Sequence, residues 1–102
     1  MVVYGDIREE IVAVGITSLL VSIPQIQPTQ RKLFYLRNSS PNAADIITIS
    51  LTGNSPAVAN QGIVLKQGDI YSESSQSGFV VWQGQINAIC ATANGQLSVV
   101  ER

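Results

Sequence analysis

The side chains that could do chemistry are few, and they form no recognisable catalytic set. The sequence has no histidine, which removes Ser-His-Asp and Cys-His catalysis and most zinc and copper sites. It also lacks both the Gly-Lys-Ser/Thr phosphate loop and the GxGxxG motif. We therefore predict that the protein is not an enzyme and that it uses no metal or other cofactor.

The remaining reactive groups are one cysteine and seven scattered carboxylates. Cys90 lies in the apolar run NAICAT and is predicted to be a small buried hydrophobic residue. Asp69 and Glu73 share a face of a predicted strand but lie about 13 Å apart, too far for a glycosidase pair. A calcium site that uses Asp45 or Asp69 with loop carbonyls is conceivable, but no EF-hand spacing supports it, and solvated loop charges are the favoured interpretation.

Aromatic side chains are the other candidates for binding. Trp82 could stack on a sugar ring, but core packing is the commoner role of a tryptophan. Phe34 and Tyr35 are adjacent on a predicted strand and therefore point to opposite sides. One of the two is expected in the core and the other at the surface or at an interface.

Composition points to one domain with a contact surface. A chain of 102 residues with 45% hydrophobic residues is long enough for a single domain with its own core. Only 13% of its residues are charged, against about 25% in ordinary soluble domains, and the net charge is −1. Surfaces poor in charge favour association. The basic residues form no run longer than Arg31-Lys32, so no nucleic-acid partner is predicted.

The most apolar stretch is residues 11–23. It is too short to span a bilayer and follows Glu9 and Glu10 rather than a basic segment, so neither a membrane span nor a signal peptide is predicted. Asp6 and Glu9 could form a capping box and open a helix. The density of Val and Ile favours one long strand over residues 11–23, bent near Gly15.

Turn signals recur about every 8 to 12 residues from Arg31 onward, a spacing typical of sandwiches and barrels. The predicted strands are 11–23, 31–38, 45–52, 62–66, 69–74, 79–83, 85–92 and 96–101. In the run 45–52, alternation of apolar residues predicts one buried face. Asn94-Gly95 predicts a type I′ hairpin between the last two strands. The predicted fold is an all-β, antiparallel, jelly-roll-like sandwich of about eight strands over residues 11–102, with an N-terminal arm at 1–10.

Several short runs resemble those of small β-sandwich modules in the virion proteins of tailed bacteriophages. The runs are 31–39, 47–49, 61–69, 82–89 and 97–101, within a region that covers about two thirds of the chain. The resemblance implies a capsid decoration or cement protein on the virion surface, made in the host cytoplasm. Such proteins are commonly trimers that bridge neighbouring copies of the major capsid protein. The candidate interface residues are Val2, Val3, Tyr4, Ile7, Ile11 and Trp82.

An alternative within the same resemblance is a receptor- or carbohydrate-binding module of a phage tail or head fibre. That function needs an exposed aromatic residue beside hydrogen-bonding loops. Trp82, Tyr71 and the loop 53–62 are the candidates for it.

Overall fold

Eight β-strands and no helix make up the part of the chain that the computed structural model describes, residues 8–22, 31–51, 56–75 and 80–102. In chain order the strands are β1 (Arg8–Val14), β2 (Leu19–Ser22), β3 (Leu33–Asn38), β4 (Ile47–Ser50), β5 (Ile63–Leu65), β6 (Ile70–Ser74), β7 (Ile86–Cys90) and β8 (Gly95–Glu101). From residue 31 onward, every predicted strand except 79–83 corresponds to one of them, with ends that differ by at most two residues.

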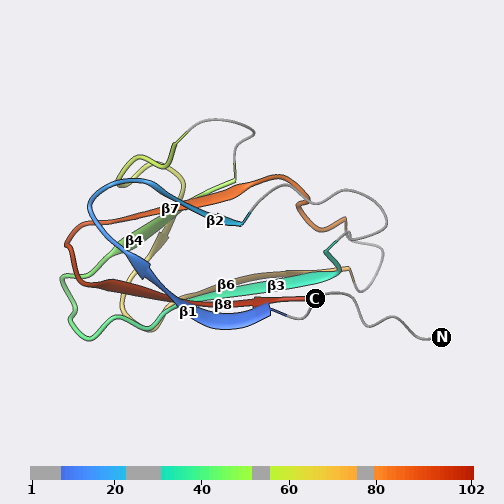
Figure 1. The fold of residues 1–102 in the computed structure, drawn as a ribbon, viewed down its shortest axis with the longest axis horizontal. Helices are drawn as coiled ribbons and strands as arrows, with labels where there is room; N and C mark the ends of the chain where they lie inside the picture. Colours follow the sequence, from blue (N-terminus) through green and yellow to red (C-terminus); the bar gives the residue numbers. More distant parts are fainter. Residues whose placement is uncertain (1–7, 23–30, 52–55, 76–79) are drawn as a thin grey trace.

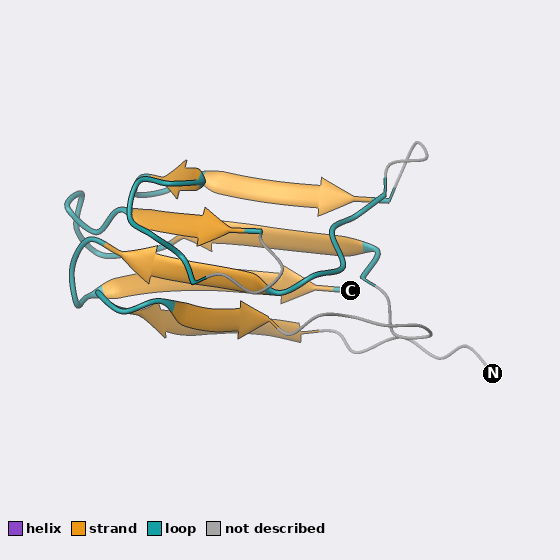
Figure 2. Cartoon of the chain, turned by 90° about the horizontal axis from the view of Figure 1, so that it is seen from above, coloured by secondary structure: helices purple, strands orange, loops and turns teal. Residues whose placement is uncertain are grey.

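The strands form two four-stranded antiparallel sheets packed face to face (Figure 1), with the orders β1-β8-β3-β6 and β2-β7-β4-β5. Each strand of the first half of the chain pairs with one of the second half: β1 with β8, β2 with β7, β3 with β6 and β4 with β5. This is the strand order of a jelly roll, in which one long hairpin is rolled into two sheets. The predicted all-β sandwich is therefore confirmed, and Figure 2 shows its strands running along the long axis.

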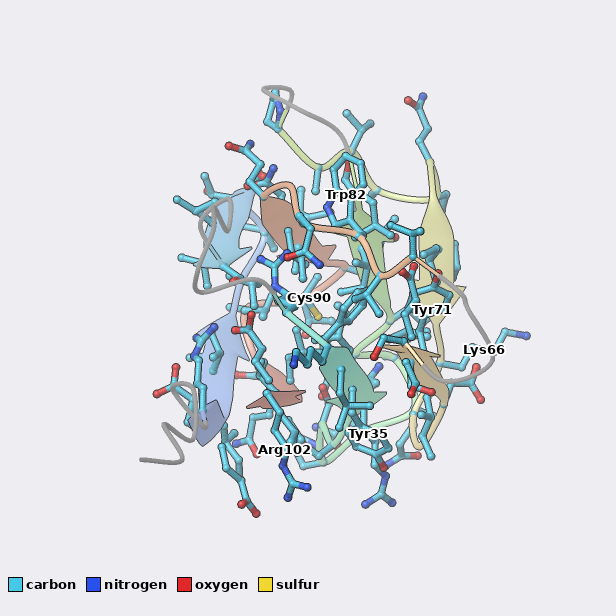
Figure 3. All side chains as sticks on the ribbon, turned by 90° about the vertical axis from the view of Figure 1, so that its right-hand side faces the viewer. Tyr35, Lys66, Tyr71, Trp82, Cys90 and Arg102 are labelled. Carbon is cyan, nitrogen blue, oxygen red and sulfur yellow. The ribbon has the colours of Figure 1, made fainter. Side chains whose placement is uncertain are left out.

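The core lies between the two sheets and is filled by alternate residues of the strands. Successive side chains of a strand point to opposite faces, so in β8 Leu97 and Val99 are fully buried while Gln96 is exposed. The buried hydrophobic residues are Val14, Val21, Phe34, Leu36, Ile47, Ile49, Leu65, Val81, Ile86, Ala88, Cys90, Leu97 and Val99. Figure 3 shows Cys90 between the sheets, which confirms its prediction as a small buried hydrophobic residue.

One bent strand was predicted over residues 11–23, but the described part of this stretch, residues 11–22, belongs to two strands. β1 ends at Val14 in one sheet and β2 lies in the other, and between them the Gly15 carbonyl accepts a hydrogen bond from the Cys90 N–H at 2.8 Å. Val14 and Val21 are seven residues apart, so in one regular strand they would point to opposite faces. Crossing between the sheets lets both side chains enter the same core.

Residues 79–83 were predicted as a strand, and they are irregular where the structure describes them. Val81 enters the core. The Trp82 N–H donates to the Glu73 carboxylate at 2.9 Å rather than to a neighbouring strand. A side chain therefore replaces the ladder partner that a strand would need, and the prediction for this segment was wrong.

Asn94-Gly95 does not form the predicted hairpin turn. β7 and β8 belong to different sheets, and neither residue has a positive φ. Gly95 is required for another reason: a Cβ there would lie 2.5 Å from the Val14 carbonyl oxygen and 2.7 Å from the Cys90 sulfur. The glycine allows three segments to approach closely where the chain passes from one sheet to the other.

The predicted arm is shorter than residues 1–10. β1 includes Arg8–Glu10, which pair with Glu101, Val100 and Val99 of β8, so these three residues belong to the sandwich. Residues 1–7 lie outside the described residues, and the arm stays a prediction for them.

Candidate interaction surface

The outer face of the β1-β8-β3-β6 sheet, called the open face below, carries two rows of outward side chains. Residues directly opposite one another in antiparallel strands lie on the same face, so the strand register defines the rows. The first row is Glu9, Val100, Tyr35 and Ser72, and the second is Ile11, Ser98, Arg37 and Ile70. Each row crosses all four strands of the sheet.

Half of these side chains are apolar or aromatic. Ile11 on β1 is 64% exposed and Ile70 on β6 is 53% exposed, although large aliphatic side chains are usually buried. Tyr35 and Val100 lie between them, half-buried, and Figure 3 shows Tyr35 pointing away from the opposite sheet. A shallow depression of about 400 Å³ is lined by Ile11, Tyr35 and Val100, among others.

The open face also carries one acid and one base. Glu9 on β1 and Arg37 on β3 are exposed, and neither forms an ion pair with another described residue. They lie in adjacent rows with β8 between their strands. The two rows together therefore carry no net charge, and no other described residue neutralises either of their two charges.

The chain itself covers β4 on the outer face of the other sheet, whereas Leu20 of β2 and Val64 of β5 on that face are 49% and 38% exposed. The Asn60 N–H donates to the Thr48 hydroxyl of β4 at 3.1 Å, and the Ala57 N–H donates to the Ser18 hydroxyl at 2.8 Å. Thr48 and Ser50 are consequently buried, so β4 has two buried faces rather than the one predicted from alternation. Of the two outer faces, the open face is the one without such a cover among the described residues.

A buried ionic network closes one end of the sandwich. The Arg31 guanidinium, only 2% exposed, donates to the Glu101 carboxylate at 2.7 Å and to the Ser22 hydroxyl at 2.7 Å. It also donates to the carbonyls of Trp82 and Gly84, both at 2.9 Å. One side chain thereby joins β2, β8 and the segment that precedes β7.

Glu101 is the acceptor at the centre of this network. Its Oε1 accepts a hydrogen bond from Arg8 of β1 at 2.7 Å, and its Oε2 accepts one from the Ser22 hydroxyl at 2.8 Å in addition to the one from Arg31. Burial by itself raises the pKa of Glu101, but the hydrogen bonds from Arg31, Arg8 and Ser22 outweigh burial and lower it. All of its contacts are internal, so the network holds the fold together and presents no site to a ligand.

The other carboxylates singled out from the sequence organise turns. The Asp45 carboxylate accepts hydrogen bonds from the Asn42 N–H and the Thr92 hydroxyl. Asp69 precedes β6 and accepts from the Lys66 N–H at 3.0 Å. Within the described residues no group of three or more His, Cys, Asp or Glu side chains could hold a metal ion.

Trp82 and Tyr71 are engaged within the molecule. The Trp82 indole N–H donates to the Gln85 carbonyl at 3.0 Å, and its ring lies so close to Gly84 that a Cβ there would be 2.2 Å from it. The Tyr71 hydroxyl donates to Glu73, and its ring packs 5.9 Å from that of Phe34. Burial and the Glu73 carboxylate raise the pKa of Tyr71 to about 12.

The structure places the six predicted interface residues differently. Ile11 lies on the open face. Trp82 instead packs against the core, and its carbonyl accepts a hydrogen bond from Arg31. The other four lie outside the described residues: Val2, Val3, Tyr4 and Ile7. Sequence reasoning missed Ile70 and Val100, whose position beside Ile11 depends on strand pairing. It did find one signal, because Phe34 is fully buried and its neighbour Tyr35 faces outward, as the adjacent pair predicted.

No protein-family model, no curated protein and no solved structure matches this chain. No helix long and apolar enough to cross a membrane occurs in the described part of the chain.

Proposed function

We propose that this chain is a non-enzymatic structural protein of a tailed-phage virion, of the capsid decoration or cement type. It oligomerises on the capsid surface and bridges neighbouring copies of the major capsid protein. The observation that carries the proposal is the open face, where exposed apolar side chains lie beside two charges that form no ion pair with another described residue. Jelly rolls serve many functions, so the fold alone does not carry it.

Low charge and the absence of histidine agree with a contact function. A decoration protein gains affinity from many weak contacts made at once, and charged residues are depleted at the centres of protein interfaces. The chain has only 13% charged residues, and Ile11 and Ile70 offer apolar contact area in the open face. The trimer favoured by the resemblance to decoration proteins remains a prediction.

The test is to add the purified protein to capsids assembled from the major capsid protein of its phage and to sediment the particles. We expect the protein to sediment with the capsids at a fixed ratio and to raise the temperature at which they break. Deletion of residues 1–7 should weaken attachment while leaving every described strand in place. Protein that stays in the supernatant and is absent from purified virions would refute the proposal.

The alternative, a carbohydrate-binding module, depends on Tyr35. The aromatic residues first named for it, Trp82 and Tyr71, make internal contacts, whereas Tyr35 lines the depression beside Arg37 and Ser98. An aromatic ring beside hydrogen-bonding groups is what a sugar ring needs. A glycan array decides: binding of one glycan that Tyr35→Ala abolishes would favour this function over decoration.

A further inference from the structure

The open face has a pattern of residues that is complementary to itself. We propose that it binds the open face of a second copy of the chain, the two copies being related by a two-fold axis that runs along the strands between β8 and β3. The inference rests on the proposed function, since it names the surface and the symmetry through which the protein oligomerises, and it puts a two-fold dimer in place of the trimer that the resemblance implies.

The axis places β1 of one copy opposite β6 of the other, and β8 opposite β3. Each row then lies opposite the same row of the second copy. In the second row, Ile11 then faces the second copy's Ile70, and Ile70 faces its Ile11. In the first row, Val100 faces the second copy's Tyr35. Every apolar residue of the two rows thus meets an apolar or aromatic one, and each contact occurs twice, as in any two-fold interface.

The charges are complementary under the same operation. Glu9 faces the second copy's Ser72, one strand and one row away from the second copy's Arg37. That offset is about 8 Å in the plane of the sheet, a distance that the two long side chains can span. The only charges of the two rows therefore form two ion pairs across the interface, and no like charges face one another.

The packing repeats a geometry the protein already uses. Aligned sheets pack about 10 Å apart with their strands rotated by about 30°, and the sandwich already packs two four-stranded sheets face to face. A face of four short strands is small for a protein interface, so we expect a micromolar dissociation constant. The outer face of the other sheet is less suited to this pairing because Asn60 of the segment 56–62 lies against Thr48 of β4, an inner strand of that sheet.

The first experiment measures the mass of the full chain by sedimentation equilibrium between about 1 and 100 µM, the range that brackets a micromolar dissociation constant. We expect a monomer–dimer equilibrium whose dissociation constant rises at least about tenfold in Ile70→Glu, because the change puts a charge opposite the second copy's Ile11. The matched control is Val80→Glu, since Val80 is 83% exposed but lies off the open face. A strict monomer, a trimer, or equal effects of the two changes would overturn the inference.

Charge reversal tests the proposed ion pairs. Arg37→Glu and Glu9→Arg should each weaken the dimer, because each places like charges near one another. The double variant restores opposite charges and should recover most of the lost affinity. Weakening without recovery in the double variant would count against this arrangement of the two copies.

A disulfide test reports the register directly. Ile11 and Ile70 lie on the two edge strands of the sheet, about 14 Å apart, so cysteines there cannot bond within one copy. We expect Ile11→Cys/Ile70→Cys to give disulfide-linked dimers on oxidation, and either single variant to give none, with buried Cys90 left in place. Dimers from Ile11→Cys alone would indicate pairing of β1 edges and would overturn the inference.

Capsid binding separates this inference from the proposed function. Dimers that fail to bind capsids would refute the decoration function and leave the two-fold contact standing. If Ile70→Glu loses capsid binding but keeps the wild-type mass, the open face binds the capsid protein instead, and the inference is overturned while the proposed function stands.

Discussion

At the scale of single residues, the ion pair between Arg31 and Glu101 is the contact on which the fold depends most. Both side chains are at least nine-tenths buried, and a charge in such a place is tolerated only when paired and hydrogen-bonded. Ser22 and two backbone carbonyls satisfy the remaining polar atoms. Removing either charge would leave the other one buried without its partner.

We predict that Glu101→Gln lowers the free energy of unfolding by about 3 kcal/mol, because it leaves the Arg31 charge uncompensated. Urea denaturation followed by tryptophan fluorescence measures the change. The matched control is Glu10→Gln, which also removes an Arg8 partner but at an exposed site, where ion pairs contribute at most about 1 kcal/mol. Equal losses of unfolding free energy in the two variants would show that the buried ion pair contributes no more to stability than the exposed one.

The same carboxylate predicts how stability depends on pH. The pKa of Glu101 is lower in the folded chain than in the unfolded one, so its contribution is fully present above the ordinary glutamate pKa of about 4.3. It is lost as the pH falls from there through the lowered pKa of the folded state. The free energy of unfolding, measured by urea denaturation at pH values from 2 to 6, should fall less steeply with falling pH in Glu101→Gln than in the wild type. An equally steep fall would show that other groups cause the pH dependence.

At the scale of elements, close approaches of backbone segments determine where the chain changes sheets. Gly95 lies where β8 begins, against the end of β1 and the last residue of β7. Gly62 has a φ of 128° and lies against the Ile49 carbonyl, so it combines an unusual backbone conformation with a lack of space. Gly15, by contrast, has open space around its Cα.

We predict that Gly95→Ala lowers the free energy of unfolding by about 2 kcal/mol or more, because the new methyl group meets the Val14 carbonyl and Cys90. Gly15→Ala is the control and should change stability by less than about 1 kcal/mol, since nothing lies within reach of its methyl group. Thermal unfolding compares the two. An unchanged unfolding temperature in Gly95→Ala would mean that the segment between β7 and β8 shifts to make room for the methyl group at little cost in free energy.

At the scale of the whole molecule, the jelly roll joins the two ends of the described chain. Arg8 pairs with Glu101 in the β1–β8 ladder, and β8 pairs in turn with β3. Most of the stabilising pairs are therefore between residues far apart in sequence, a topology that folds slowly because long loops must close first. We therefore expect truncation of β1 or β8 to destabilise the fold.

We predict that deletion of residues 1–7 keeps the cooperative unfolding transition, whereas deletion of residues 1–10 lowers the unfolding temperature by several degrees. The longer deletion removes Arg8–Glu10 from β1 and with them the Arg8 hydrogen bonds to Glu101 and to the Val21 carbonyl. Differential scanning calorimetry distinguishes the two. Equal unfolding temperatures would show that Arg8–Glu10 do not contribute to the stability of the sandwich.

By itself the sequence determined the properties that depend on near neighbours. Alternation of apolar residues and the spacing of turns predict an all-β sandwich, place Cys90 in the core and assign opposite sides to Phe34 and Tyr35. These predictions succeed because the two-residue period of a strand is a local property. They fail where a local pattern fits two structures, as at residues 11–23 and at Asn94-Gly95.

Only the tertiary structure decided which strands become neighbours. The pairing of Arg31 with Glu101, seventy residues away, and the meeting of Ile11, Val100 and Ile70 on one face depend on how the rolled hairpin closes. This pairing depends on the whole chain, because β1 and β8 are neighbours in one sheet while the six strands between them in sequence are divided between two sheets. The absence of histidine could be read from the sequence, and the open face could not.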